Sequence, residues 1–255
     1  MTYCAGLLLE GGLVMLSDSR TNAGVDHIST FRKMTVWEKP GERMIVLLTA
    51  GNLAITQAVV GLLEEGIENE DGEGGDTMET VPSMYGAARL VGAAIREIYR
   101  VDGESLNAQS TEFNASFILG GQIKDRRMRL FQIYSAGNFI EATEDTPYFQ
   151  IGEHKYGKPI LDRVATYRTS LTGGAKLALI SMDSTLRSNI SVGLPLDLLI
   201  YRKNSLAVSM HRRIDADDPY FNEISQRWSE SLGRAFGELP DPDWVAACQP
   251  EGAKA

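Results

Sequence analysis

Residues 1–20, MTYCAGLLLEGGLVMLSDSR, decide the fold expected for the chain. Residues 3–9 and 13–17 are apolar runs of strand length, and the Glu-Gly-Gly turn at residues 10–12 is typical of a hairpin. The first strand begins directly after Thr2, so a pattern that can enter a sheet starts almost at the first residue. Removal of the initiator methionine would give Thr2 a free α-amine beside its hydroxyl, and this pair of groups is a candidate catalyst.

The composition is that of a folded protein with a sizeable core. The chain has 255 residues, of which 43% are hydrophobic and 23% charged, and its net charge is −9 at pH 7. Because this acidic charge repels phosphates and anionic lipid headgroups, we expect neither nucleic acid nor a membrane as a partner. The longest apolar runs fall far short of the ~20 residues that span a bilayer, and the start of the chain lacks the basic region of a secretory signal. We therefore expect a cytoplasmic protein.

The cysteines and histidines give no sign of cross-links or of a metal site. Cys4 and Cys248 are the only cysteines, so a disulfide framework is not expected and a reducing compartment fits. His27, His154 and His211 are the only histidines, and none has a second histidine at the spacing of a helical metal site. We expect neither a metal nor a cofactor.

The strand-turn-strand pattern recurs along the chain. Residues 34–38 and 43–49 flank a Lys-Pro-Gly-Glu turn, and a helical face follows over residues 53–63. Beyond it we expect helices at residues 82–101, 158–167, 174–188 and 219–239, strands at residues 114–121, 128–134, 195–202 and 207–213, and a short pair of strands near Phe139 and Phe149.

This order of elements predicts an α+β fold in which two antiparallel sheets pack face to face with helices outside, a four-layer αββα sandwich. No internal repeat or linker divides it, so we expect one domain over residues 1–240 and a tail over residues 241–255. The acidic, glycine-rich stretch at residues 64–80 is expected to be a solvated loop, with an acidic docking site as the alternative.

Three polar residues lie at the ends of the first strands. Thr2 precedes the first strand, Asp18 follows the second and Lys33 precedes the third, and antiparallel strands can bring such ends to one sheet edge. An α-amine, with an ordinary pKa of about 7.7–8.0, is a suitable base for the hydroxyl of the same residue. A buried Lys33 ammonium would lower the pKa of both Thr2 groups, and Asp18 would hold Lys33 charged and oriented. Taken singly, the three are an ordinary second residue, a turn cap and a solvated charge.

A tetrahedral intermediate also needs amide donors. The Thr-Ala-Gly-Asn segment at residues 49–52 runs from a strand end into a helix N-terminus, where backbone N–H groups point outward. The Gly51 N–H is the candidate oxyanion donor. The alternative is a glycine that only lets the chain turn into the helix.

The segment from Thr2 through SDSRTNAGVDHISTFRKM (residues 17–34), with TAGN behind it, resembles the β-type subunits of proteasomes and their bacterial relatives, most closely the Anbu subfamily. The resemblance extends from Thr2 to about Leu239 and includes GEHKYGKPIL at residues 152–161. It implies an N-terminal nucleophile hydrolase that assembles into rings or ring-like spirals with the sites facing inward. The roles that it implies are the nucleophile for Thr2, the acidic partner after the second strand for Asp18, the lysine before the third strand for Lys33 and the oxyanion donor for Gly51.

The chain departs from that family pattern at two places. Where proteasome subunits offer a serine to the terminal amine in a Gly-Ser-Gly turn, this chain has Gly152-Glu153-His154. Where they have an aspartate ahead of a Ser-Gly pair, this chain reads RSNISVG at residues 187–193, which leaves Ser188 and Ser191 as candidates. Glu153 and His154 are either an acid/base pair near the site or a solvated turn.

Tyr3 and Arg20 are candidate substrate-binding residues because they lie close to Thr2 in the pattern, and Glu153, which stands where the family has its serine, is the third. The leading hypothesis is a threonine-type peptidase or amidase that acts on a peptide or protein through an acyl-enzyme on Thr2. The alternatives are an assembly subunit that binds peptide or protein without general proteolysis, and an amidase for small or modified peptides. Under each of them we expect a homo-oligomer.

Overall fold

The computed structural model describes residues 1–23, 27–67 and 75–244. The chain divides into two compact units, Met1–Ala216 and Asp217–Ala255, and each is considered by itself. The described part of the second unit consists mainly of helix α5 (Pro219–Glu238), which Asp218 caps at its N-terminus. Cys248 and the middle of the acidic stretch lie outside the described residues. The single domain expected over residues 1–240 stays a prediction.

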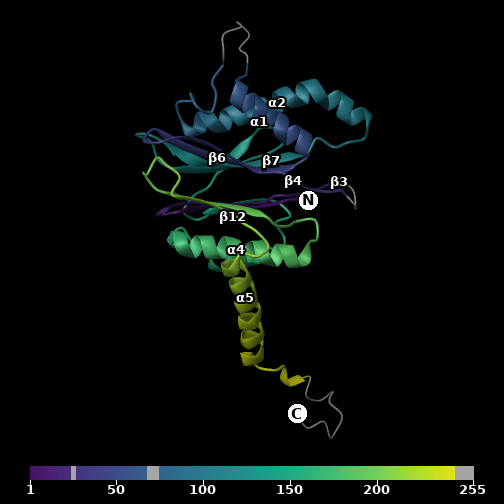
Figure 1. The fold of residues 1–255 in the computed structure, drawn as a ribbon, viewed down its shortest axis with the longest axis vertical. Helices are drawn as coiled ribbons and strands as arrows, with labels where there is room; N and C mark the ends of the chain where they lie inside the picture. Colours follow the sequence, from purple (N-terminus) through teal and green to yellow (C-terminus); the bar gives the residue numbers. More distant parts are fainter. Residues whose placement is uncertain (24–26, 68–74, 245–255) are drawn as a thin grey trace. The chain divides into compact units, whose positions relative to one another are not determined.

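The first unit is built on two five-stranded antiparallel sheets. The first sheet contains, in spatial order, β10 (Tyr148–Gly152), β1 (Tyr3–Leu9), β2 (Gly12–Asp18), β11 (Leu196–Arg202) and β12 (Met210–Ile214). The second contains β5 (Met34–Lys39), β6 (Arg43–Gly51), β7 (Ala115–Ile123), β8 (Arg129–Ile133) and β9 (Phe139–Glu141). Helices α1 (Leu53–Glu65) and α2 (Met84–Ala108) lie outside the second sheet, and α4 (Leu171–Ser188) covers the first, with α3 (Lys158–Val164) against α4 (Figure 1). The four-layer αββα sandwich is confirmed.

Most expected elements are present with shifted ends. The second helix begins after its cap Ser83 and continues to Ala108, seven residues beyond the expected end at residue 101. The helix expected over residues 158–167 ends at Val164. Two further strands, β3 (Arg20–Ala23) and β4 (His27–Thr30), pair with each other in a separate ribbon that the sequence pattern did not predict.

The pair of strands expected near Phe139 and Phe149 is wrong as a pair. β9 follows β8 as the next strand of the second sheet, whereas β10 crosses to the first sheet and pairs with β1. Both strands are short and leave the alternation ambiguous, so proximity in the sequence suggested a hairpin that the chain does not form.

The core has two hydrophobic layers. One lies between α1, α2 and the second sheet, and the other fills the space between the two sheets. β1 and β2 are covered on both faces, which is why every residue in them is buried. Because side chains alternate along a strand, Cys4 faces the second sheet, whereas the ring of Tyr3 faces α4 and contacts Ser181.

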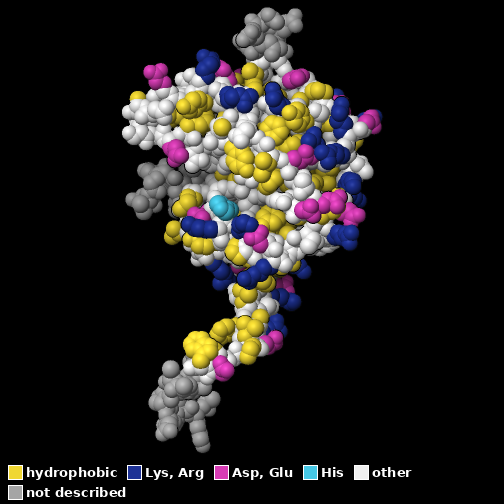
Figure 2. Space-filling model, turned by 180° about the vertical axis from the view of Figure 1, so that it is seen from behind, with side chains coloured by type: hydrophobic (Ala, Val, Ile, Leu, Met, Phe, Trp, Pro, Cys, Tyr) yellow, Lys and Arg dark blue, Asp and Glu magenta, His cyan; other side chains and the backbone are white. Residues whose placement is uncertain are grey.

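The surface and the helices give a few further facts. Figure 2 shows basic and acidic side chains interspersed over one face of the protein. None of the helices in the described ranges combines the length and hydropathy that crossing a bilayer requires. Within residues 1–23, 27–67 and 75–244, no three His, Cys, Asp or Glu side chains come together as metal ligands would.

Gly6 is a point where the two sheets approach closely, so it provides a test of the packing. A Cβ there would lie 2.9 Å from Ile118 Cγ2 and 3.2 Å from Leu130 Cδ1, both on the second sheet. We expect Gly6→Val to lower the free energy of unfolding by about 1–3 kcal/mol, measured by urea denaturation at a fixed protein concentration. Gly61→Ala in α1 is the control: its Cβ meets nothing within 4 Å, and we expect a gain of roughly 0.5–1 kcal/mol. Equal effects of the two substitutions would contradict this description of the interface.

Candidate functional site

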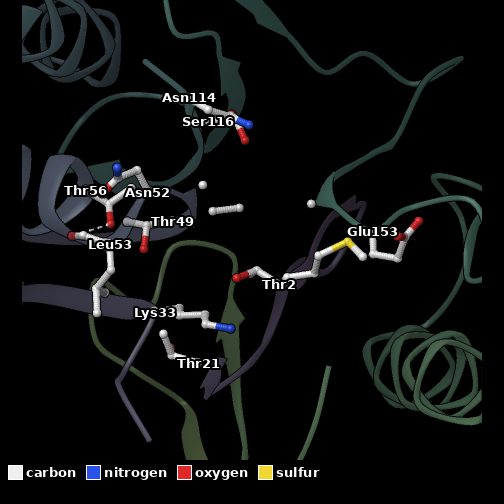
Figure 3. Close-up of a pocket in the computed structure, with 14 residues that line it drawn as sticks. Thr2, Thr21, Lys33, Thr49, Asn52, Leu53, Thr56, Asn114, Ser116 and Glu153 are labelled. Carbon is white, nitrogen blue, oxygen red and sulfur yellow. Dashed lines mark hydrogen bonds between the residues drawn. The ribbon is translucent and has the colours of Figure 1, made fainter. Parts of the chain in front are cut away.

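Thr2 lies in a cavity of about 670 Å³ at the end of the sandwich where β1 begins and β6 ends. Figure 3 shows the Thr2 hydroxyl pointing into this cavity close to the Lys33 ammonium, with Thr49, Asn52 and Ser116 on the opposite side. The lining residues come from both sheets and from the start of α1: Met1, Thr2, Thr21, Lys33, Thr49, Ala50, Gly51, Asn52, Leu53, Thr56, Asn114, Ser116, Gly152 and Glu153.

Lys33 and Asp18 form a buried ion pair beside Thr2. The Lys33 Nζ lies 2.8 Å from Asp18 Oδ1, and the two side chains are 5% and 0% exposed. The ammonium also donates to the carbonyl of Arg20 at 2.6 Å. The Asp18 carboxylate accepts from the Tyr3 N–H at 3.1 Å and from the Gly193 N–H at 3.4 Å. Each charge is therefore compensated by its partner and by backbone groups.

The strand order explains why these residues meet. Asp18 is the last residue of β2, which pairs with β1, so it lies beside the start of β1 where Thr2 stands. Lys33 directly precedes β5 in the other sheet, and its carbonyl accepts from the Thr49 N–H at 2.9 Å, which fixes it at the end of β6. The expected meeting of Thr2, Asp18 and Lys33 at one edge is present, although it joins two stacked sheets rather than neighbouring strands of one.

Burial and charge shift the ionisation of two groups at the site. Burial lowers the pKa of the Met1 α-amine below its ordinary 8.0, and the Lys33 ammonium lowers it further, while the carboxylates of Asp18 and Glu153 act against this shift. Burial raises the pKa of the Asp18 carboxyl, and the Lys33 ammonium opposes that change. The site thus disfavours a protonated amine close to Lys33.

Gly51 has a backbone conformation that favours glycine. Its φ is +114°, and a Cβ would lie 2.3 Å from the carbonyl oxygen of Asn114. Backbone N–H groups point to alternate sides along a strand. The Thr49 N–H points to the β5 side and the Asn52 N–H points to Asn114 beside β7. The Gly51 N–H therefore points to the β5 side, beyond the first residue of that strand. The next residue, Asn52, caps α1 through its side chain. The Gly51 N–H is therefore directed to the same side as Lys33.

Glu153 and Asn189 occupy the region next to Met1. The Glu153 N–H donates to the Thr2 carbonyl at 2.7 Å, and its carboxylate accepts from Asn189 Nδ2 at 2.9 Å. Asn189 also lies 3.8 Å from the Met1 sulfur. Ser188 is exposed at the end of α4 and Ser191 is half-buried, and neither lines the cavity. The structure brings Asn189, between the two candidate serines, to Glu153.

Tyr3 and Arg20 do not line the cavity. The Tyr3 ring is buried on the other face of β1, where its hydroxyl contacts Ser181 and Gln150 and burial raises its pKa to about 12. The Arg20 guanidinium donates to the carbonyl of Ile190 at 3.1 Å. Of the three candidate substrate-binding residues, only Glu153 reaches the cavity, because strand alternation turns the residue after Thr2 away from it.

Several residues that line the cavity were not predicted from the sequence. Asn114 and Ser116, at the start of β7, are far from Thr2 in the chain and carry no motif. Thr21 also lines the cavity, and its buried hydroxyl has no hydrogen-bond partner among the described residues. Its place next to Asp18 and Arg20 was the only available signal for it.

Comparison with solved structures places the chain in a family. Anbu from Hyphomicrobium sp. strain MC1 is 54% identical, with 94% of this chain and 99% of that chain covered and a TM-score of 0.86. The ancestral β-subunit Anbu from Yersinia bercovieri is 51% identical over 94% and 98% of the two chains, also with a TM-score of 0.86. A helical assembly of the Anbu complex from Pseudomonas aeruginosa contains a chain 46% identical over 99% and 100%, with a TM-score of 0.87. No family model and no curated protein matches the chain. At this identity and coverage, the chain belongs to the Anbu family of proteasome-like β-type subunits, in the N-terminal nucleophile hydrolase superfamily.

Proposed function

We propose that the protein is a threonine-type peptidase or amidase that uses Thr2 after Met1 has been removed. The observation that carries the proposal is the buried Lys33–Asp18 ion pair beside the Thr2 hydroxyl, in a cavity large enough for a peptide segment. A buried ion pair is costly to remove from water, and this one holds the Lys33 ammonium at the position where a positive charge would activate a hydroxyl and an amine.

The proposed reaction has two steps. The Thr2 hydroxyl attacks the carbonyl carbon of an amide while the α-amine of Thr2 accepts its proton, and the Gly51 N–H donates to the oxyanion of the tetrahedral intermediate. The C–N bond then breaks, the leaving amine takes the proton, and the acyl group remains as an ester on Thr2. Water attacks this ester with the same amine as base, which releases the acid and restores the hydroxyl.

Met1 is the element that prevents this reaction in the unprocessed chain. While Met1 is attached, the nitrogen of Thr2 is an amide and has no basic lone pair. The Met1 amine is one residue away, in a region where burial and Lys33 already disfavour its charged form. After removal of Met1, the amine is on Thr2 itself and subject to the same burial and the same ammonium.

We also propose that the protein forms a homo-oligomer and acts on a peptide or protein. The related chain from Pseudomonas aeruginosa is described in a helical assembly. In the second unit of this chain, Leu232 and Phe236 of α5 are exposed apolar side chains that would suit contact with another copy. Glu153 is the proposed substrate contact in the cavity.

The first prediction concerns Thr2 itself. Protein that lacks Met1 should form a covalent adduct on Thr2 with a β-lactone or epoxyketone probe, whereas Thr2→Ala should form none, because it has no hydroxyl. Thr2→Ser should keep the reaction, since it retains both reacting groups. Intact mass spectrometry measures the loss of Met1 and the gain of the probe together.

Thr111→Ala is the control, because Thr111 lies outside the cavity. It should react with the probe like the wild type. Processed wild-type protein that gains no probe mass, or Thr2→Ala that gains as much, would remove the proposed function.

The second prediction concerns pH. The base must be unprotonated, so kcat/KM for a peptide amide should rise with pH and be half-maximal below pH 8.0, because burial and Lys33 lower the pKa of the Met1 amine from that value and would act on the Thr2 amine in the same direction. The Glu153 carboxylate raises the pKa of the amine, so Glu153→Gln should move the acidic limb of the pH profile of kcat/KM to lower pH. A limb that moves up in Glu153→Gln would contradict the assignment of the amine as the base.

The third prediction concerns the ion pair. Asp18→Asn leaves Lys33 buried without its counter-charge and should lower the free energy of unfolding by about 3–5 kcal/mol. Lys33→Met should also destabilise, and the double variant should lose less than the two single variants together. Chemical denaturation of all four proteins measures this coupling. The exposed pair Lys158–Asp162 is the matched control, because Asp162→Asn should cost no more than about 1 kcal/mol.

A further inference from the structure

A second hollow adjoins the Thr2 cavity along strand β10. It has a volume of about 700 Å³ and lies between α3 and the second sheet, with all of β10 along it. Ser116 and Gly152 line both this groove and the Thr2 cavity, so the groove begins where the cavity ends. Gly152 pairs with Tyr3 and Tyr148 pairs with Leu7, so the groove leads away from Thr2 along the strand.

β10 is the outermost strand on its side of the first sheet, and half of its backbone groups point outward. The Glu153 N–H donates to the Thr2 carbonyl and the Leu8 N–H donates to the Pro147 carbonyl, both at 2.7 Å. Because the direction alternates along an antiparallel strand, the groups of residues 149 and 151 also face β1, and those of Tyr148, Gln150 and Gly152 face the groove. The Gly152 carbonyl already accepts a hydrogen bond from the His154 N–H at 3.0 Å. In the described part of the chain, no other strand pairs with this edge.

Apart from Asp145, the acidic and basic side chains along the groove are paired with each other. On the α3 side, Lys158 and Asp162 form an ion pair at 2.6 Å, and the Tyr148 hydroxyl donates to the same carboxylate. On the side of the second sheet the wall includes Gln132 and Ser116, which are uncharged. Such a groove would recognise backbone amides through the strand edge and place little demand on the side chains of its ligand.

We propose that an extended segment of a polypeptide substrate binds in this groove as an added strand on the outer edge of β10. The proposal rests on the proposed function in one respect, namely that the segment belongs to the chain whose amide enters the Thr2 cavity. At about 3.4 Å per residue, the five residues of β10 match roughly five residues of an extended ligand. The groove thus selects unfolded polypeptides over very short peptides.

The test measures binding without turnover. Thr2→Ala protein is mixed with reduced, carboxymethylated α-lactalbumin, a permanently unfolded polypeptide, and amide hydrogen exchange is followed at single-residue resolution. The amides of Tyr148, Gln150 and Gly152 should exchange at least about 10-fold more slowly with the polypeptide than without it, because each would donate to the added strand. The amides of Phe149 and Ile151, already bonded to β1, should change little.

Two kinds of variant test the groove independently. Gln150→Pro removes one outward N–H without touching the bonds to β1, and Gln150→Ala controls for the lost side-chain contact with Tyr3. Gln132→Trp fills the groove from the opposite wall, and Ala136→Trp, in an exposed turn outside both cavities, is its control. Gln150→Pro and Gln132→Trp should raise the Kd for the unfolded polypeptide at least about 10-fold, while both controls leave it near the value of the parent.

The outcomes separate the two proposals. The groove proposal would be overturned if the polypeptide bound without protecting the three amides, or if all variants bound it with equal affinity. It would also be overturned if Thr2→Ala did not bind the polypeptide at all. Protection of the edge in the free protein that increases with protein concentration would also overturn it, because another copy would then cover β10. If processed wild-type protein binds and protects in the expected way but forms no adduct at Thr2 and cleaves nothing, the groove stands and the peptidase proposal fails. If it cleaves an acetylated tetrapeptide but none of the groove variants changes the Kd for the unfolded polypeptide, the peptidase proposal stands and the groove proposal fails.

Discussion

The buried ion pair between Lys33 and Asp18 is the constraint on which the site depends. At an effective dielectric constant of about 20, two unit charges about 4 Å apart attract by ~4 kcal/mol, whereas removing each ion from water costs several kcal/mol. The balance is tolerable only when the remaining hydrogen-bonding groups are also satisfied. Here the Arg20 carbonyl and the N–H groups of Tyr3 and Gly193 supply those bonds. The pair therefore requires the start of β1, the end of β2 and the loop before β11 to be in place together.

This requirement explains the arrangement of elements around the cavity. Asp18 ends a strand of the first sheet, and Lys33 directly precedes a strand of the second, so the charges join the two sheets where the apolar layer between them ends. The hydrophobic contacts further in, among them those around Gly6, fix the separation of the sheets. In the proposed mechanism, the position of the Lys33 charge is thus set by packing at some distance from Thr2.

The sequence predicts this fold well because its strands are long apolar runs with clear turns, and the sandwich follows from their order with the helices. It predicts β3 and β4 poorly, since Arg20 and Thr30 belong to short polar strands without apolar alternation. It also predicts that Lys33 and Gly51 lie at the cavity and that Asp18 pairs with Lys33, because each lies at the end of a strong element. The hydrogen bond from Asn189 to Glu153 was not predictable, because which residue of the RSNISVG segment faces Glu153 depends on where α4 ends, and helix ends are set by tertiary contacts.

The backbone around Thr2 shows how a residue at the start of a chain can be held in a fixed position. Terminal residues usually fray unless they are tied into a sheet. Here the Thr2 carbonyl accepts from the Glu153 N–H, and Gly152, with φ +80°, allows β10 to approach so closely that a Cβ would lie 2.0 Å from that carbonyl. The hydrogen bond and the strand register hold Thr2 without using its nitrogen or its hydroxyl. Loss of Met1 would therefore free the amine while leaving the residue in place, which is the geometry that a hydroxyl and its own base require.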